Sequence, residues 1–325
     1  MISIAMTTYN GEKYLRDQLD SILNQTYKDF ELIICDDNSS DGTKKLLAEY
    51  EKKDERIKVF FNEENLGFIK NFGKAISFCK GEYIAFSDQD DIWEAFKLEY
   101  AIKNIGTNDL YCSNSLIVDE NNNAGNEKKT LVHDVLGLAY IPASNDILSK
   151  HLLYENFCQG ATILAKAEFI KGLNEIPSEF KFHDQWYALV ASVKNGIVYD
   201  DNCTLRYRQH GNNVTSNTAK NFMERFFSIN KDNISKIGLN SYRCKFVSDC
   251  TFFPEDFREY AKTVYEYLTA LKEGVIFKSQ KLFIQNYKYW IFDKNLIHKI
   301  LMILRHFLKV VMIKIFLQQE RREEA

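Results

Sequence analysis

Short apolar runs alternate with amphipathic stretches from residue 1 to about residue 105. Four runs rich in β-branched or aromatic residues predict strands at Ile2–Met6, Phe30–Cys35, Ile57–Phe61 and Glu82–Ser87. Apolar residues at helical spacing predict helices, one through Leu15, Leu19, Ile22 and Leu23, one ending near Lys53, and two at Phe68–Cys79 and Glu94–Asn104. Strands that alternate with helices in this way are typical of β-α-β units around a parallel sheet.

The pattern becomes mixed in the second half of the chain. It predicts strands at Leu110–Val118, Phe157–Leu164 and Ile197–Tyr207 (one strand or two), a helix at Asp184–Lys194 and an Asn-rich loop at Asp119–Thr130. From about Asn221 onward the apolar spacing is helical. We therefore expect an α/β domain over residues 1–218 and a helical region over residues 219–325.

The composition narrows the class of protein. Apolar residues make up 45% of the 325 residues and prolines number only three, so we expect a globular chain. The formal net charge is −3, which gives no overall positive field to hold nucleic acid. The seven cysteines contain no C-x-x-C pair and are interpreted as buried thiols in a reducing compartment. The chain begins directly with a strand-like run and has no basic leader, so we expect a cytoplasmic protein.

Three carboxylates fall within four residues directly after the fourth predicted strand, at Asp88, Asp90 and Asp91. Like charges this close raise one another's pKa unless a cation neutralises them. Oxygen ligands suit Mg²⁺ or Mn²⁺. The alternative is a solvated acidic turn that caps the next helix. The position favours a metal site, because ligands of open α/β sheets bind outside the carboxyl ends of the strands.

Other polar residues follow the neighbouring strands, and we expect Thr7, Tyr9 and Asp37 to converge with the acidic cluster. For Asp37 the alternative is a role in the turn that precedes the next helix. The loop Thr7–Gly11 contains a single glycine, and neither G-x-G-x-x-G nor a Walker pattern occurs. A nicotinamide-cofactor domain is thus disfavoured, and the charge of a bound diphosphate would have to be met by a metal.

Several of these segments recur together in the order and spacing of a known family. They are Ile4–Asn10, Ser21–Thr26, Phe30–Thr43 and Asn65–Gly67. They resemble the family 2 glycosyltransferases, and the likeness extends over about residues 1–215. The resemblance implies a GT-A fold, in which a mostly parallel central sheet is flanked by helices, with residues 1–105 as the nucleotide-sugar-binding half and residues 106–218 as the acceptor-side half. More narrowly, Phe86–Trp93 resembles bacterial rhamnosyltransferase-like members that build surface polysaccharides.

The resemblance implies roles in donor binding. Thr7 and Tyr9 would line the nucleobase pocket, and Asp37 would accept a hydrogen bond from the base. Asp88 and Asp90 would be the two acids of the D-x-D motif, Asp88 contacting the ribose and Asp90 binding the metal that holds the diphosphate. For Asp91 two roles stay open, which are orienting a sugar hydroxyl of the donor and capping the next helix.

An inverting transfer also needs a carboxylate that takes the proton of the acceptor hydroxyl. By resemblance Asp184 is this base, with a helix N-cap as the alternative. Many relatives have Glu-Asp at this place, so His183 departs from the family pattern. Gln159 and Gly160 would border the acceptor site, although Gly160 is also explained by a tight backbone bend.

The segment Arg206–Asn213 resembles the late basic segment of the family, which carries a histidine. His210 would complete the metal sphere or donate a hydrogen bond to the leaving diphosphate, and Arg208 would supply positive charge to the donor. The alternative is a purely structural histidine.

The stretch Leu296–Leu317 carries its basic residues on one half of a helical wheel. This pattern suits a helix that lies on anionic lipid, whereas its charges argue against a membrane span. The alternative is a helix packed on the catalytic domain or on a second subunit of a homo-oligomer.

Together these features predict an inverting transfer that depends on Mg²⁺ or Mn²⁺. The donor would be a nucleoside-diphosphate sugar, either dTDP-rhamnose or a UDP-hexose. The acceptor would be a glycan or lipid-linked saccharide at the inner face of the cell membrane. The rival predictions are a nucleotidyltransferase, which usually needs a basic glycine-rich loop near the N-terminus, and a non-catalytic protein that binds sugar nucleotides.

Overall fold

The computed structural model of the chain describes residues 1–126, 128–136, 138, 141–173, 175–211, 231–290, 310–311 and 313–314. The chain forms two compact units. Unit 1 consists of Met1–Leu136, Phe157–Ile176 and Phe182–Asn217, and unit 2 consists of Gly137–Asn156, Pro177–Lys181 and Thr218–Ala325. The domain expected over residues 1–218 ends beside the same boundary, but two of its internal segments belong to unit 2.

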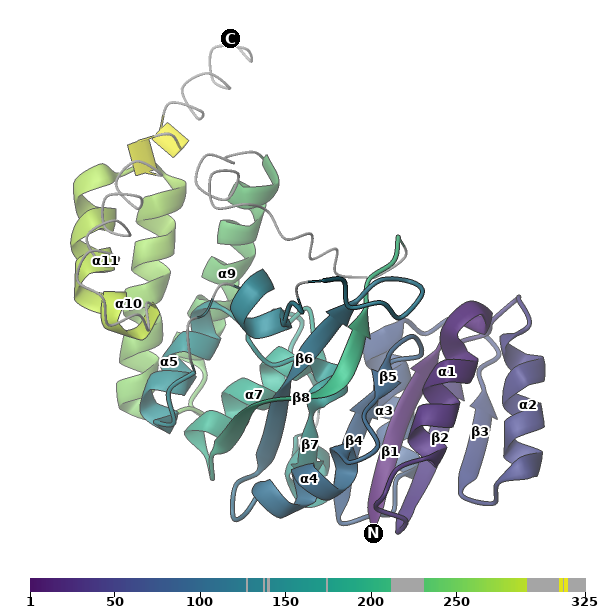
Figure 1. Cartoon of the computed structure of the whole chain (residues 1–325). Coiled ribbons are helices and arrows are strands. Elements are labelled where there is room, and N and C mark those ends of the chain that lie inside the picture. Colours follow the sequence, from purple (N-terminus) through teal and green to yellow (C-terminus); the bar gives the residue numbers. More distant parts are fainter. Residues whose placement is uncertain are drawn as a thin grey trace. The chain divides into compact units, whose positions relative to one another are not determined.

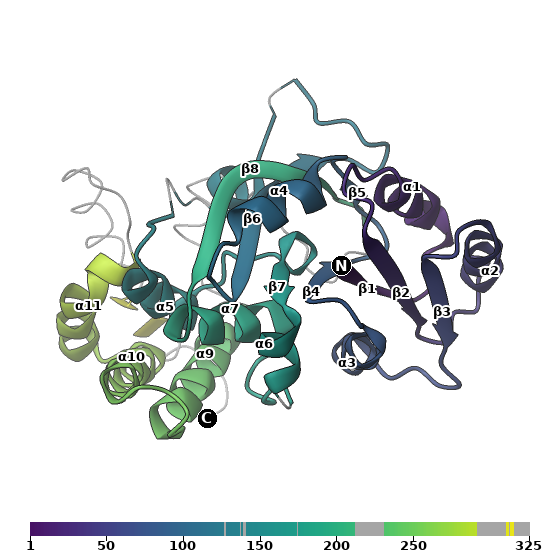
Figure 2. The same ribbon diagram turned by 90° about the horizontal axis from the view of Figure 1, so that it is seen from below.

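One side of the eight-stranded sheet of unit 1 is wholly parallel, in the order β3-β2-β1-β4. Its strands are β1 (Ile2–Thr8), β2 (Phe30–Asp36), β3 (Ile57–Phe61) and β4 (Tyr83–Ser87), and the helices between them are α1 (Glu12–Leu23), α2 (Thr43–Lys53) and α3 (Phe68–Phe78). Figure 1 and Figure 2 show α1 and α2 on one face of these strands and α3 on the other. All four carboxyl ends therefore reach one edge of the sheet, as predicted.

The other strands continue the sheet from β4 in the order β7-β6-β8-β5. They are β7 (Leu164–Lys166), β6 (Leu110–Val118), β8 (Ile197–Arg208) and β5 (Ile92–Trp93), accompanied by α4 (Lys97–Asn104), α6 (Ala167–Gly172), α7 (His183–Val193), the π-helix η1 (Leu131–Val135) and the 3-10 helix η2 (Gly160–Thr162). Strand β7 is antiparallel to both of its neighbours, β8 is parallel to β6, and β5 is antiparallel to β8. This side of the sheet departs from regular β-α-β alternation.

The strand expected at Phe157–Leu164 is wrong. Gly160–Thr162 forms a turn of 3-10 helix, in which the Thr162 N–H donates to the Gln159 carbonyl at 2.9 Å. The strand β7 begins only at Leu164. Much of the run is buried, and hydrophobic periodicity alone cannot separate a buried strand from a buried turn.

The helix expected at Glu94–Asn104 begins later, at Lys97. The preceding residues form the short strand β5, in which Ile92 pairs with Arg206 and Trp93 with Leu205 of β8. A two-residue strand is fixed by its partner more than a hundred residues away, so local spacing gave no signal for it.

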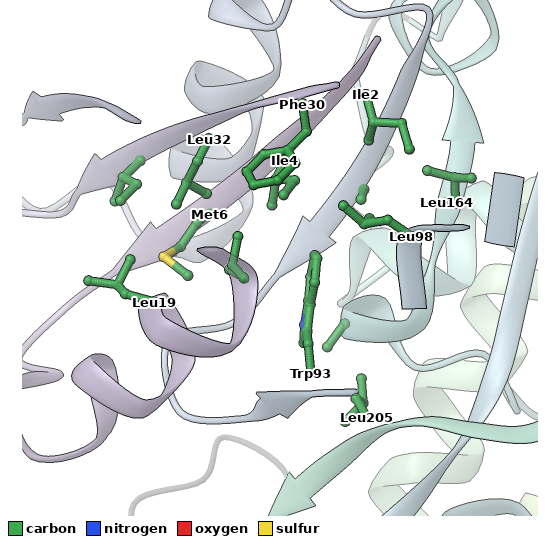
Figure 3. Packing of buried hydrophobic residues seen from close by; sticks show 14 of the residues in the cluster. Ile2, Ile4, Met6, Leu19, Phe30, Leu32, Trp93, Leu98, Leu164 and Leu205 are labelled. Atoms are coloured by element: carbon green, nitrogen blue, oxygen red, sulfur yellow. The ribbon is translucent and has the colours of Figure 1, made fainter. Parts of the chain in front are cut away.

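Apolar side chains from both sides of the sheet form one core in unit 1. Ile2, Ile4 and Met6 alternate along β1, point to the same face and are fully buried, as the two-residue period of a strand requires. Figure 3 shows them near Leu19, Phe30, Leu32, Trp93, Leu98, Leu164 and Leu205. Each such side chain contributes about 1.5–3 kcal/mol when it is fully buried. The core therefore fixes the strands whose ends carry the candidate site residues.

The described elements of unit 2 are helices, which agrees with the helical region expected at the end of the chain. They are α5 (Asn145–Tyr154), α9 (Lys231–Asp249), α10 (Glu255–Lys272) and α11 (Ile276–Trp290), and α10 packs against both α9 and α11. Among the described residues, none of the helices is sufficiently long and apolar to cross a membrane. The surface helix expected at Leu296–Leu317 lies outside the described residues, apart from residues 310, 311, 313 and 314.

Candidate active site

The loop after β1 is joined to the loop after β4 by one side chain, that of Gln89. The Tyr9 N–H donates to Gln89 Oε1 at 2.8 Å, and Gln89 Nε2 donates back to the Tyr9 carbonyl at 3.1 Å. Gly11 leaves the space for this amide, because a Cβ on Gly11 would overlap Gln89 Oε1. This role of Gln89 could not be predicted from the sequence, since a glutamine inside an acidic cluster has no distinctive signal.

The loop after β1 is also joined to the loop after β2. The Asn10 N–H donates to Ser39 Oγ at 2.9 Å, the Ser40 N–H donates to Asn10 Oδ1 at 2.8 Å, and the Gly11 N–H donates to Thr43 Oγ1 at 2.9 Å. Asn10 adopts a positive φ of 48°, which asparagine tolerates better than most residues. The loops that follow the three neighbouring strands β1, β2 and β4 are thus joined, as expected for a parallel sheet.

Two of the expected donor-binding residues lie at this junction with different exposure. Thr7, near the end of β1, is half-buried, whereas Tyr9 is 50% exposed. The backbone of Tyr9 is held by Gln89, so its aromatic ring projects from a fixed loop. A fixed and exposed ring is suited to stacking on a planar base.

Asp37 has a different environment from the one expected. Its carboxylate is 3% exposed and accepts hydrogen bonds from Asn62 Nδ2 at 2.8 Å, the Leu66 N–H at 2.8 Å and the Gly67 N–H at 2.9 Å. These bonds use most of the acceptor capacity of a carboxylate. In this structure Asp37 therefore holds the loop before α3, and it does not present a carboxylate at the surface.

The acids of the cluster after β4 differ sharply in exposure. Asp88 and Asp90 are half-buried, whereas Asp91 is 0% exposed. Burial, then the negative charges of Asp90 and of Asp184, raise the pKa of Asp88 to about 7. The charge of Asp184 thus acts on the acid after β4, although the two residues come from different halves of unit 1.

Asp91 is buried and does not cap the next helix. Its buried carboxylate accepts the Arg208 N–H at 3.2 Å, and burial raises its pKa. The next helix, α4, begins only at Lys97, so Asp91 does not cap it. Burial also lowers the pKa of Lys97 to about 7, although the charge of Asp91 opposes this shift. Asp91 therefore joins the acidic loop to the end of β8.

Asp90 and His210 lie together, although 120 residues separate them in the sequence. Asp90 Oδ2 is 2.9 Å from His210 Nε2, and the imidazole is stacked on the Tyr14 ring with centroids 4.6 Å apart. Two ligand atoms at neighbouring corners of an octahedral Mg²⁺ sphere are about 3.0 Å apart, given bonds of about 2.1 Å. The pair therefore fits two adjacent ligand positions of one metal ion.

The described part of the chain has no group of three or more His, Cys, Asp or Glu side chains arranged to hold a metal. Two protein ligands are nevertheless typical of Mg²⁺ sites in which substrate phosphates and water occupy the other positions. Such a site would be complete only with the nucleotide bound.

Arg208 is buried, and its guanidinium is hydrogen-bonded within the protein. It is 2% exposed, and its guanidinium donates to the Asp90 carbonyl at 3.0 Å, the Glu120 carbonyl at 2.7 Å and Asp17 Oδ2 at 2.8 Å. It also lies over the Tyr14 ring, 4.7 Å from the centroid. Arg208 therefore holds the backbone of Asp90 and the ring that stacks on the imidazole. The roles of Tyr14 and Asp17 have no signal in the sequence, because both are ordinary residues of an amphipathic helix.

Asp184, which was expected on the acceptor side, is half-buried in the first turn of α7. Its Oδ1 accepts the Gln185 N–H at 2.6 Å, and its Oδ2 accepts the Gly160 N–H at 3.2 Å. Phe182 occupies the position before the helix, so Asp184 is not its N-cap residue. Gln159, also half-buried, accepts a hydrogen bond from Ser115 Oγ at 2.8 Å. The expected acceptor-side residues thus lie together.

The family of the chain follows from comparison with known proteins. A family model described as Glycosyl transferase family 2 matches residues 3–162. An uncharacterized glycosyltransferase of Haemophilus influenzae is 31% identical over 227 residues, which are 68% of this chain and 84% of that relative. The chain therefore belongs to glycosyltransferase family 2. The rhamnosyltransferase-like subgroup stays a prediction.

Two further relatives carry more specific names. TuaG of Bacillus subtilis is 43% identical over 99 residues, which are 30% of this chain and 39% of TuaG. The chain thus spans well under two thirds of that relative. The Escherichia coli protein WfgD, a UDP-Glc:alpha-D-GlcNAc-diphosphoundecaprenol beta-1,3-glucosyltransferase, is 29% identical over 226 residues, which are 68% of this chain and 81% of WfgD.

Solved structures establish the fold. S. aureus TarS 1-349 in complex with UDP-GlcNAc matches with a TM-score of 0.56 at 15% identity, covering 98% of this chain and 92% of that chain. The mannosyltransferase PcManGT of Pyrobaculum calidifontis, in complex with GDP-Man and Mn²⁺, matches with a TM-score of 0.54 at 14% identity, covering 97% and 86%. The expected GT-A fold is thereby confirmed.

Proposed function

We propose that this chain is an inverting, metal-dependent glycosyltransferase that acts on a nucleoside-diphosphate sugar. One observation supports the proposal, which is that the charge of Asp184 acts on the acidic cluster after β4. The charge of Asp184 raises the pKa of Asp88, and Asp90 lies 2.9 Å from His210. Acids on both sides of a site suit a reaction in which one side of the site binds a diphosphate and a carboxylate on the other side accepts a proton.

On the donor side, Tyr9 stacks on the nucleobase and Thr7 lines its pocket. Asp90 and His210 hold Mg²⁺ or Mn²⁺, with Asp88 contacting the ribose. The metal, when bound, supplies positive charge that stabilises the departing diphosphate. Arg208 supports this arrangement, because its guanidinium holds the backbone of Asp90.

On the acceptor side, Asp184 takes the proton of the acceptor hydroxyl as that oxygen attacks the anomeric carbon. The bond between the anomeric carbon and the diphosphate breaks on the opposite face of the sugar, which inverts the configuration. Two backbone N–H groups hold the Asp184 carboxylate. These hydrogen bonds fix the orientation of the carboxylate.

We infer a glycan or lipid-linked saccharide as the acceptor, within bacterial surface polysaccharide synthesis. The name of WfgD, which describes a diphosphoundecaprenol-linked acceptor and a UDP-glucose donor, supports this class. The donor is dTDP-rhamnose or a UDP-hexose. A lipid-linked acceptor would place the protein at the inner face of the cell membrane, with the segment Leu296–Leu317 as its contact with the surface.

A donor screen tests the proposal. The full chain is incubated with a panel of nucleoside-diphosphate sugars and Mn²⁺ or Mg²⁺, with and without lipid-linked saccharide, and the released nucleotide is identified. Release of nucleoside diphosphate that depends on the metal and is increased by acceptor supports the proposal. Release of pyrophosphate from a nucleoside triphosphate and a sugar phosphate would instead indicate a nucleotidyltransferase. Binding without turnover across the panel would indicate a non-catalytic protein.

A further inference from the structure

His183, which directly precedes Asp184, occupies an aromatic cage in unit 1. Its ring is 4.5 Å from that of Phe72 on α3, 5.2 Å from that of Phe86 on β4, with which it stacks at 26°, and 6.0 Å from that of Tyr187 on α7. The side chain is 6% exposed. The imidazole is therefore a core side chain that joins three elements behind the candidate site.

Core packing alone does not explain a histidine at this place. Neither ring nitrogen has a hydrogen-bond partner within the part of the chain that the structure describes. Burial lowers the pKa of His183 to about 4, so the ring is neutral at pH 7. A buried polar atom without a partner lowers stability, and an apolar ring would avoid this cost. The shape of the imidazole is the property that remains to be explained.

The imidazole lies directly against Gly160. A Cβ on Gly160 would be 2.9 Å from His183 Nε2 and 3.3 Å from its Cε1, which is too close for a real contact with Nε2. Gly160 is not among the glycines with positive φ, so its backbone conformation does not require glycine. The tight bend considered for Gly160 is therefore not the reason for this residue. Glycine is needed because the five-membered ring fills the place of a side chain.

The same glycine holds the candidate base, because the Gly160 N–H donates to Asp184 Oδ2 at 3.2 Å. The His183 ring thus sets how closely η2 can approach the first turn of α7. We propose that His183 is a positioning residue, whose ring fixes Gly160 at the distance that orients the Asp184 carboxylate. This inference rests on the proposed function of Asp184 as the base.

The substitution His183→Phe separates positioning from packing. A phenyl ring keeps the cage filled and removes the unpaired nitrogens, so the Tm is expected to stay equal or rise. Its six-membered ring reaches further and presses on Gly160, which displaces the N–H that holds Asp184. We expect kcat to fall about tenfold or more, with the KM for the donor within about twofold, because a displacement near 1 Å can cost about a hundredfold in rate. If packing were the whole role, His183→Phe would keep full activity.

A double-mutant cycle tests the contact between His183 and Gly160 by changing both residues. Gly160→Ala alone is expected to lower kcat about a hundredfold. In Gly160→Ala/His183→Ala the added methyl group enters the space left by the ring, and kcat should recover about tenfold over Gly160→Ala. Contacting residues show such non-additivity, whereas independent ones do not. Additive effects in the folded double variant would overturn the proposal.

The pH dependence of kcat provides a readout that a structural role would not move. Loss of the Gly160 hydrogen bond removes an interaction with the charged carboxylate, so the apparent pKa of the acidic limb should rise in His183→Phe. Val190→Ala is the matched control, because Val190 is fully buried on the same helix. This control should lower the Tm and leave the acidic limb of the pH profile of kcat unchanged. An unmoved limb in His183→Phe together with an unchanged kcat would exclude positioning.

Asp184→Asn separates this inference from the proposed function. If Asp184→Asn retains normal transfer, the assignment of the base fails, and the positioning role fails with it. If Asp184→Asn is inactive while the His183 and Gly160 variants are fully active, only the positioning role is wrong.

Discussion

The two sides of the sheet in unit 1 hold their site residues by different means. On the parallel side, loops that follow neighbouring strands are joined by hydrogen bonds, as between Tyr9 and Gln89 and between Asn10 and Ser39. On the mixed side, Asp184 is held by the N–H of Gly160, which belongs to a 3-10 turn. The donor side is thus built by the regularity of the fold, and the acceptor side by individual contacts. We expect substitutions on the donor side to affect donor binding most and substitutions on the acceptor side to affect kcat most.

The largest effect is expected for Asp184→Asn. Loss of the base removes the proton acceptor, and general-base catalysis contributes about 10²–10⁴-fold, so kcat should fall by about 10³-fold. The KM for the donor and the thermal shift with nucleotide should stay near the wild-type values, since the donor side is untouched. Steady-state kinetics with saturating acceptor make the measurement.

Glu168→Gln is the control for this charge change, because Glu168 is an exposed acid of α6 on the same side of the sheet. Activity close to wild type is expected for it. A donor affinity that collapses in Asp184→Asn would show that Asp184 belongs to donor binding, and the contrast between the two sides would then be wrong.

The metal pair should give the next largest effect. Asp90→Asn is expected to lower activity about a hundredfold and to raise the Mn²⁺ concentration needed for half-maximal rate, because Asp90 is the only carboxylate of the proposed two-ligand site. His210→Ala should have a smaller effect of the same kind. Metal titrations of the rate at fixed donor concentration provide the test. If His210→Ala lowers the rate without changing the metal requirement, the imidazole acts on the leaving diphosphate instead.

Gln89→Ala tests the junction between the donor-side loops. It removes both hydrogen bonds that join Gln89 to the Tyr9 backbone. Hydrogen bonds contribute about 0.5–1.5 kcal/mol each, so the loss corresponds to about a tenfold rise in the donor KM, with kcat changed little. Thr26→Ala on the same sheet side is a control, because Thr26 binds Glu99 at the surface. A fall in kcat with an unchanged donor KM would contradict the division between the two sides.

The same contrast explains which parts of the fold and of the candidate site could be predicted from the sequence. Parallel strands with helices between them show their periods locally, and the bounds of Ile57–Phe61 were predicted as observed. The convergence of Tyr9 with the acids after β4 followed from the direction of the strands alone. Asp90 and His210 were placed in one metal site by family resemblance, and the structure brings them together.

The surroundings of other expected site residues depend on distant contacts, which the sequence pattern does not show. Arg208 was expected at the donor, but its burial depends on Asp17 and Glu120, which lie far from it in the sequence. Asp91 was expected in the site, and it is buried because it accepts the Arg208 N–H. Charge and motif spacing cannot show which carboxylate of a cluster faces inward. Here this depends on where β8 ends.

The smallest expected effect is on the pH dependence of stability, and it tests how His183 is packed on the acceptor side. The pKa of His183 is about 4 in the folded protein because of burial, against an ordinary value of 6.5. Between these pH values the unfolded chain binds more protons than the folded one. The free energy of unfolding, as far as it depends on His183, is therefore highest above about pH 6.5 and falls as the pH is lowered toward 4. The slope from this one group is at most about 1.4 kcal/mol per pH unit. Denaturant unfolding at several pH values should show a flatter dependence for His183→Phe than for the wild type. An unchanged slope would mean that His183 is protonated in the folded state, and the description of a neutral ring against Gly160 would have to be abandoned.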